Sequence, residues 1–271
     1  MTQGGDHQTS FVQGVRTYVI NLRRRTDRRA RMESALPAAL GAVFTSDWDG
    51  PFDGNALCRS DLARAGYDLF PWRIESDNPW WSRPLKYGEI GCTLSHLAVW
   101  RQAFTASADY AVVLEDDAIL PDCFRGKLFS ALRSLRGAFD LLYLGRYPLE
   151  PDRAFSPGVV VPGYSHCTYG YVVTRQALRV LLAQELDKAI VPIDEFLPSL
   201  YIDHPRADLR ARFPRQLTAL ALDPPLVRQR CKEEAGSDTE ASAFVEDAPS
   251  STANGESSVP DVARATRRLG S

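Results

Sequence analysis

The sequence has few cysteines, and they are not arranged as in a metal cluster or a redox motif. The five cysteines are odd in number and none forms a Cys-x-x-Cys pair; they are Cys58, Cys92, Cys123, Cys167 and Cys231. This spacing excludes the usual patterns of zinc ribbons and thioredoxin-like sites. We therefore expect free thiols, which are typical of a reducing compartment.

Long apolar segments and an excess of charge of either sign are also absent. Nowhere do about 18 apolar residues follow one another, and the polar residues 1–13 lack the apolar stretch of a secretory signal. We expect a cytoplasmic protein with no transmembrane segment, an expectation that leaves peripheral membrane contact open. Lys and Arg total 32 and Asp and Glu total 34, so the net charge of -2 argues against nucleic acid as the main partner.

The sequence does contain enough apolar residues for a substantial core. With 271 residues and 44% hydrophobic content, the chain is long enough for one large α/β domain. Residues 1–16 are rich in Gly, Gln and Thr, and residues 241–271 are rich in Ser, Ala, Pro, Asp and Glu. Both compositions are typical of flexible tails, so we expect a single domain at residues 17–240.

Strand-like and helix-like segments alternate within this domain. A helix expected at 89–104 carries Ile90, Leu94 and Leu97 on one face and His96 on the opposite, more polar face. Buried strands are expected at the apolar runs 17–22, 110–114, 140–144 and 169–173, and further helices at 28–36, 124–135 and 175–185. The alternation predicts an α/β fold with a mostly parallel central sheet flanked by helices.

Three consecutive acidic residues, Glu115-Asp116-Asp117, follow the apolar run Ala111-Val112-Val113-Leu114. The carboxyl edge of a sheet is where α/β proteins bind ligands, and three carboxylates brought together there repel one another unless a cation is present. Oxygen-rich sites of this kind suit Mg²⁺ or Mn²⁺. The alternative is a solvated acidic turn in which one of the aspartates caps a helix.

A basic loop follows the first expected strand and leads into a helix. Its sequence is Asn21-Leu22-Arg23-Arg24-Arg25-Thr26-Asp27-Arg28-Arg29. Guanidinium groups and backbone amides at a helix start can bind a diphosphate, and Arg23, Asp27 and Arg28 are the residues we favour for this role. We interpret Arg24, Arg25 and Arg29 as part of a solvated helix face.

Asp194 and Glu195 lie between two prolines in the segment Val191-Pro192-Ile193-Asp194-Glu195-Phe196-Leu197-Pro198. Partial burial would raise the proton affinity of either carboxylate and suit it to act as a general base. Alternatively, both residues complement the dipole of a helix N-terminus.

A lone histidine such as His96 is more often structural than a ligand. Trp72, Trp80 and Trp81 suit either stacking on a sugar or anchoring of their loop.

Taken together, these segments resemble glycosyltransferase family 25, which contains bacterial lipooligosaccharide galactosyltransferases and procollagen galactosyltransferases. The resemblance rests on the order and spacing of several motifs between residues 17 and 240. They are Val19-Ile20-Asn21-Leu22-Arg23 with Asp27-Arg28-Arg29, Gly88-Glu89-Ile90-Gly91-Cys92 with Leu94-Ser95-His96, Val113-Leu114-Glu115-Asp116-Asp117, Asp140-Leu141-Leu142-Tyr143-Leu144-Gly145-Arg146, Tyr169-Gly170-Tyr171-Val172-Val173, the 192–198 segment, and Ser237-Asp238-Thr239-Glu240.

The resemblance implies a GT-A fold and an inverting transfer of a hexose, most often galactose, from a UDP-sugar with Mn²⁺ or Mg²⁺. It implies that the acidic motif of the family falls on Glu115 and Asp117, with Asp117 as the direct metal ligand and Glu115 nearer the ribose or a metal-bound water. Asp238 or a late histidine would complete the metal shell, and we expect Asp194 or Glu195 to be the catalytic base. The donor-binding residues would be Asn21, Arg23, Asp27, Arg28, Asp49, His96, Glu115 and Asp116. The acceptor would be a saccharide, as in lipopolysaccharide biosynthesis, a glycolipid or a natural product.

Two other classes of function fit the same residues. One is a catalytically silent binding module, because a glycosyltransferase fold can lose its chemistry and keep its shape. The other is a metal-dependent nucleotidyltransferase or phosphohydrolase, which also needs clustered carboxylates and arginines.

Overall fold

An eight-stranded sheet organises residues 14–246, the part of the chain that the computed structural model describes. In sheet order the strands are β2 (Val43–Phe44), β1 (Val15–Ile20), β3 (Tyr110–Glu115), β8 (Ser165–Thr174), β5 (Leu141–Pro148), β9 (Ala219–Leu222), β7 (Val159–Val161) and β6 (Arg153–Ser156). Only β8 and β7 run antiparallel to their neighbours, so six of these eight strands share one direction. This confirms the expected α/β fold with a mostly parallel sheet.

Residues 110–114 of β3 are apolar without interruption because both faces of the sheet are covered there. In β3, Ala111 and Val113 belong to one buried apolar cluster, whereas Val112 and Leu114 belong to a second cluster on the opposite face. Alternate residues of a strand point to opposite faces, so a strand buried on both sides needs an uninterrupted apolar run. Burial of β3 on both faces therefore explains the uninterrupted apolar run Ala111-Val112-Val113-Leu114 from which this strand was predicted.

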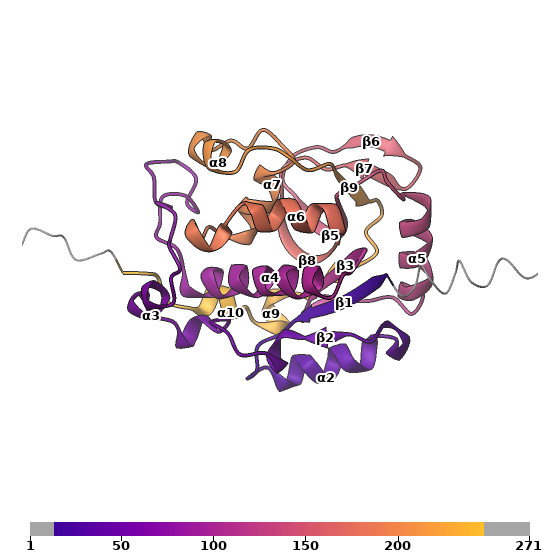
Figure 1. Ribbon diagram of the computed structural model, residues 1–271, viewed down its shortest axis with the longest axis horizontal. Coiled ribbons are helices and arrows are strands. Elements are labelled where there is room, and N and C mark those ends of the chain that lie inside the picture. The colour runs from indigo at the N-terminus through magenta and orange to yellow at the C-terminus, as the bar shows by residue number, and fades with distance from the viewer. Residues whose placement is uncertain (1–13, 247–271) are drawn as a thin grey trace, which may run out of the picture.

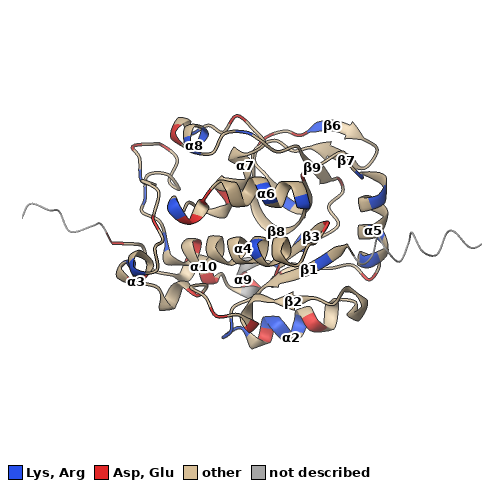
Figure 2. Ribbon diagram, viewed as in Figure 1, with Lys and Arg blue, Asp and Glu red and all other residues tan. Residues whose placement is uncertain are grey.

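Helices form a layer on each face of the sheet. One face is covered by α4 (Tyr87–Thr105), α6 (Arg175–Ala183) and α7 (Ile193–Ser199), and the other by α2 (Thr26–Ala35) and α5 (Phe124–Ser134). Figure 1 shows α4 and α6 side by side in front of the sheet, and Figure 2 shows basic positions between acidic ones along α2. The helices expected at 28–36, 89–104, 124–135 and 175–185 are therefore confirmed.

Short elements complete the described chain. They are the helices α3 (Arg59–Arg64), α8 (Ala207–Arg212), α9 (Lys232–Ala235) and α10 (Asp238–Ala241), the 3-10 turns η1 (Ala38–Leu40), η2 (Thr45–Asp47), η3 (Gly54–Ala56) and η4 (Leu186–Lys188), and a two-stranded sheet of β4 (Ala118–Ile119) and β10 (Arg228–Gln229). Figure 1 shows α9 and α10 close to α4. Within residues 14–246, no helix is both long and apolar enough to cross a membrane.

Helix α4 is buried on nearly every side, including the face that we expected to be polar. His96 and Trp100 have no exposed surface, and Thr93 is equally buried. The prediction of a polar face at His96 was wrong because α4 packs against the sheet, α6, α7 and the 54–56 turn, so the face that carries Thr93, His96 and Trp100 is covered. Glu89 does occupy the helix start as expected, where its carboxylate accepts a hydrogen bond from the Lys86 backbone N–H at 2.7 Å.

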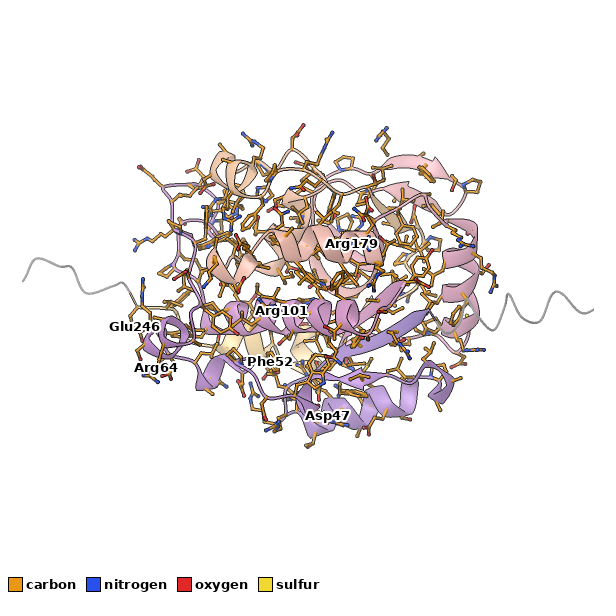
Figure 3. All side chains as sticks on the ribbon, in the orientation of Figure 1. Asp47, Phe52, Arg64, Arg101, Arg179 and Glu246 are labelled. Atoms are coloured by element: carbon orange, nitrogen blue, oxygen red, sulfur yellow. The ribbon has the colours of Figure 1, made fainter. Side chains whose placement is uncertain are left out.

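The described fold is wider than the expected 17–240 domain. Strand β1 begins at Val15, and after residue 240 the chain continues against the start of α4. The Ala243 carbonyl accepts a hydrogen bond from the Tyr87 N–H, and the Val245 N–H donates to the Leu85 carbonyl. Figure 3 accordingly places Glu246 next to Arg64 of α3. The rest of the two expected tails, 1–13 and 247–271, lies outside the described residues.

Close packing between α4 and the 52–54 loop depends on Gly91. A Cβ at this position would lie 2.2 Å from the Phe52 carbonyl oxygen, whereas a Cβ at Gly126 in α5 would meet nothing within 4 Å. Figure 3 shows Phe52 beside α4. The loop can approach the helix only because Gly91 has no side chain.

We predict that Gly91→Ala destabilises the protein by about 1–3 kcal/mol, because the loop must move away from α4. Gly126→Ala is the matched control and should stabilise the protein by about 0.5–1 kcal/mol, because its helix is open there and alanine is the better helix former. Urea unfolding of both variants measures the difference. Equal effects of the two substitutions would contradict the packing described here.

Candidate active site

A pocket of about 240 Å³ opens at the carboxyl edge of β1 and β3. The sheet edge, the start of α4, the first half of β8, the start of α7 and the segment 236–240 all contribute to its wall. Residues that line it include Asn21, Arg28, Trp80, Gly88, Glu89, Cys92, Glu115, Asp116, Asp117, His166, Thr168, Asp194, Glu195, Gln229 and Asp238. Most of the acidic residues that the motifs indicated therefore share one cavity.

Asp116 anchors the floor of this pocket through a buried ion pair. The parallel register of β1 and β3 pairs Ile20 with Glu115, which brings the next residues, Asn21 and Asp116, together. Asn21 Nδ2 donates to Asp116 Oδ2 at 2.7 Å, and Arg28 Nη1 donates to Asp116 Oδ1 at 2.8 Å. Asp116 and Arg28 are only 7% and 6% exposed. Burial raises the pKa of Asp116, although the bonds from Arg28 and Asn21 oppose that rise.

Glu115 and Asp117 flank this anchor and line the pocket. Glu115 Oε1 accepts a hydrogen bond from Thr168 Oγ1 at 2.6 Å, and Asp117 Oδ2 accepts one from Gln229 Nε2 at 3.0 Å. Asp117 Oδ1 is buried and accepts no hydrogen bond from the part of the chain that the structure describes. Burial, with the nearby negative charge of Glu115, raises the pKa of Asp117 to about 7. A buried acceptor oxygen beside a second carboxylate fits a divalent cation such as Mn²⁺ or Mg²⁺.

Glu195 is a buried carboxylate surrounded by hydrogen-bond donors. Its Oε2 accepts from Tyr164 Oη and His204 Nε2, both at 2.8 Å, and its Oε1 accepts from Trp81 Nε1 at 3.1 Å. His166 Nε2 lies 3.3 Å from the same Oε1. Burial alone would raise the pKa of Glu195, but the bonds from His166 and His204 outweigh it and lower the pKa to about 2. A carboxylate with these partners is a weak base.

Asp194 has the opposite environment although it is the adjacent residue. Its side chain lines the pocket, and its Oδ1 is buried without a hydrogen-bond partner among residues 14–246. Burial raises the pKa of Asp194 to about 6, while the charge of His166 opposes the rise. A carboxylate that holds its proton this strongly can both accept and release it near neutral pH.

Asp238 reaches the pocket from the other side but is held by arginines. Its carboxylate lies 2.6 Å from Arg24 Nη1, 2.8 Å from Arg25 Nη1 and 3.6 Å from Arg28 Nη1. Arg24 and Arg25, which we interpreted as solvated, thus connect the basic loop to α10. Because both carboxylate oxygens of Asp238 are in ion pairs, this geometry does not support Asp238 as a metal ligand.

Several residues expected to bind the donor lie outside the pocket. Arg23 forms an exposed ion pair with Asp49 at 3.0 Å, and Asp27 is an exposed partner of Arg25; none of Arg23, Asp27 and Asp49 lines the cavity. Within α2, Asp27 is exposed whereas the next residue, Arg28, is buried, because successive residues of a helix point in different directions. His96 does not line the pocket either, but lies beneath it with its Nε2 3.4 Å from Glu115 Oε1.

The contacts of two tryptophans fit the anchoring role, one of the two roles that the sequence left open. Trp72 and Trp81 anchor their loop, since Trp72 Nε1 donates to the Trp80 carbonyl and Trp81 Nε1 donates to Glu195. Trp80 is 42% exposed and lines the pocket, and its ring lies 4.8 Å from the guanidinium carbon of Arg83.

Two further residues contact the acidic triplet: Thr168 donates a hydrogen bond to Glu115, and Gln229 donates one to Asp117. No pattern in the sequence drew attention to either residue.

Comparison with known proteins agrees with the motifs and with this geometry. Residues 72–156 match the family model described as glycosyltransferase family 25 (LPS biosynthesis protein). The chain belongs to glycosyltransferase family 25. The matched residues include α4 and the acidic triplet, which together form two walls of the pocket.

Family 25 relatives include proteins with different stated activities. The chain is 36% identical over 215 residues to "Probable inactive glycosyltransferase 25 family member 3" of Rattus norvegicus, a match covering 76% of this chain and 36% of that protein. It is 33% identical over 219 residues to "Procollagen galactosyltransferase 2" of Homo sapiens, covering 78% and 34%. With "Procollagen galactosyltransferase 1-A" of Xenopus laevis it shares 32% identity over 225 residues, covering 78% and 35%. The chain thus spans about a third of the length of the curated relatives it matches.

For this family 25 chain we predict that Asp116→Ala lowers the free energy of unfolding by about 3–5 kcal/mol, because the buried Arg28 loses the carboxylate closest to it. Asp49→Ala is the matched control: it removes an exposed partner of Arg23, and no measurable change is expected. Guanidinium chloride unfolding distinguishes the two. A similarly small change in the free energy of unfolding for both substitutions would show that the buried Arg28–Asp116 ion pair contributes little to stability.

Proposed function

We propose that this chain is an inverting galactosyltransferase that transfers galactose from UDP-galactose, with Mn²⁺ or Mg²⁺, to a hydroxyl of a saccharide, a glycolipid or a natural product. The observation that carries the proposal is the half-buried Asp194, with its raised pKa, in the same pocket as Glu115 and Asp117. One pocket thus combines a general base with a pair of carboxylates suited to a cation, and the names of the procollagen galactosyltransferase relatives favour galactose.

Glu115 and Asp117 would hold the metal, and Arg28, which lines the same pocket, would assist in binding the diphosphate. When bound, Mn²⁺ or Mg²⁺ would neutralise the negative charge that develops on the leaving UDP. Gly88 and Glu89, at the start of the 19-residue helix α4, line the same pocket. The positive end of the helix dipole therefore adds to the field that favours an anion there.

The chemical step assigns a different role to each of the adjacent carboxylates. The acceptor hydroxyl oxygen forms a bond to the anomeric carbon, the bond from that carbon to the diphosphate oxygen breaks, and the hydroxyl proton passes to Asp194. Attack from the side opposite to UDP inverts the anomeric configuration. Glu195 stays ionised and, through Trp81, Tyr164 and His204, fixes the segment that carries Asp194.

We predict that Asp194→Asn lowers kcat about 10²–10⁴-fold, because the acceptor proton loses its base. Glu195→Gln should reduce kcat less than about tenfold and instead destabilise the protein by about 1–3 kcal/mol, because buried donors lose a charged acceptor. Turnover by mass spectrometry and thermal unfolding are measured on both variants. The reverse pattern would transfer the catalytic role to Glu195.

The pH dependence of the wild-type protein gives an independent test. The base must be ionised to act, and the pKa of Asp194 is raised to about 6, so kcat/KM should rise with pH and reach half of its plateau near pH 6. A glutamate with a pKa of about 2 in this role would give a rate that is flat through that range. A flat profile between pH 5 and pH 7 would therefore contradict Asp194 as the base.

A catalytically silent binding module is the second candidate function, favoured by the printed names of relatives such as "Inactive glycosyltransferase 25 family member 3" of Homo sapiens, 35% identical to this chain over 217 residues. Incubation of the folded wild-type protein with UDP-galactose, Mn²⁺ and a panel of acceptors separates the two. The enzyme should release UDP in a manner that EDTA abolishes. Binding of UDP-galactose without any release of UDP would favour the silent module.

We also propose a cytoplasmic location. It is supported by Cys58, Cys92, Cys123 and Cys231, which are free thiols within the described residues 14–246. Fractionation of source cells followed by immunodetection tests it. Recovery of the protein from an oxidising compartment would contradict it.

A further inference from the structure

The structure assigns to Cys92, His96 and Glu115 a second metal site, one that takes a thiophilic ion of the Zn²⁺ class and competes with the oxygen-ligand site for Glu115. Among the described residues, Cys92 Sγ, a ring nitrogen of His96 and a carboxylate oxygen of Glu115 all lie within 4.8 Å of one another. His96 Nε2 and Glu115 Oε1 are 3.4 Å apart. Cys92 has no other role in the site described above.

Helix geometry accounts for the pairing of the thiol with the imidazole. Cys92 and His96 are four residues apart on α4, so their side chains lie on the same face of the helix, one turn apart. Strand β3 ends opposite this face and supplies Glu115. Ligands of a tetrahedral Zn²⁺ at about 2.0–2.3 Å are separated from each other by about 3.3–3.7 Å. His96 Nε2 and Glu115 Oε1 are already within this range, and binding would require Cys92 Sγ to move closer to them by rotation of its side chain.

The surroundings of His96 are compatible with a metal-bound ring. Coordination by Nε2 requires the tautomer with the proton on Nδ1, and a metal-bound histidine normally donates that proton to a fixed acceptor. Tyr171 Oη lies 2.7 Å from His96 Nδ1 and also accepts a hydrogen bond from Trp100 Nε1 at 3.0 Å. Since a hydroxyl oxygen has two lone pairs, it can accept both bonds.

The ligand set determines which ion is selected. A thiolate and a neutral imidazole favour Zn²⁺, Co²⁺ and similar ions, whereas Mn²⁺ and Mg²⁺ favour oxygen ligands. Cys92 and Glu115 both line the pocket, so an ion has a route in and the fourth coordination position faces the cavity. Binding forms a sulfur–metal bond and releases the thiol proton to solvent.

Sharing of Glu115 has a functional consequence, which rests on the proposed transferase activity. An ion held by Cys92, His96 and Glu115 draws the Glu115 carboxylate away from Asp117 and from the donor diphosphate. Zn²⁺ should therefore inhibit the Mn²⁺-supported transfer, and the inhibition should depend on Cys92.

The binding itself is tested with Co²⁺ as the probe, on the full chain and without any donor or acceptor. Wild-type protein should bind one Co²⁺ with a thiolate-to-cobalt charge-transfer band in the near ultraviolet, and Zn²⁺ should displace it. Cys92→Ser should lose the band and weaken Zn²⁺ binding at least about tenfold, since changes even to the outer partners of metal ligands cost about 10–100-fold. Cys167→Ser is the matched control, because Cys167 also lines the pocket; it should keep the band.

A second variant guards against misfolding of the first. Glu115→Gln keeps the thiol and the imidazole, so it should retain a weakened cobalt band with an unchanged far-ultraviolet circular dichroism spectrum. Absence of the band in the wild-type protein, or an equal band in Cys92→Ser, would overturn the proposal. Because this readout needs no turnover, a protein without transferase activity can still show the band, and the two proposals fail separately.

Discussion

The pairing of β1 with β3 is the constraint on which the rest of the site depends. Their parallel register brings the ends of two strands together at one edge of the sheet, and the two residues that follow, Asn21 and Asp116, meet there. Arg28 then binds Asp116 and also reaches the Gly236 carbonyl at 2.8 Å. One buried carboxylate thus fixes the basic loop, the acidic triplet and the segment before α10 relative to one another. Glu115 and Asp117 are left facing the cavity because Asp116 points into the protein.

Unequal hydrogen bonding gives two adjacent carboxylates opposite properties. Glu195 receives bonds from groups in three separate segments, which stabilise its charge and make it a structural acceptor. Asp194 lies half-buried beside it with a buried oxygen that receives none from residues 14–246, so desolvation raises its proton affinity. The same physical rule acts at Asp117, where a neighbouring carboxylate raises the pKa further.

Local patterns predicted those features that depend on neighbouring residues in the chain. The spacing of Ile90, Leu94 and Leu97 predicted α4 to within two residues at each end, and the apolar run before Glu115 predicted β3. The roles of Asp194 and Glu195 could not be separated in this way, because the groups that bind Glu195 include ones 31 and 114 residues away. The partner of Arg25, Asp238, is 213 residues away, which explains why the basic loop was divided incorrectly into binding and solvated arginines.

In the proposed transferase, Glu115 and Asp117 would hold a divalent cation together with a nucleotide diphosphate. Isothermal titration calorimetry of UDP binding, with and without Mn²⁺, tests this arrangement in wild-type protein and in Asp117→Asn. We expect Mn²⁺ to strengthen UDP binding to the wild-type protein at least about tenfold, and the variant to lose this gain while it remains folded. UDP affinity that is independent of Mn²⁺, or a gain that persists in Asp117→Asn, would show that these carboxylates do not bind a cation with the diphosphate.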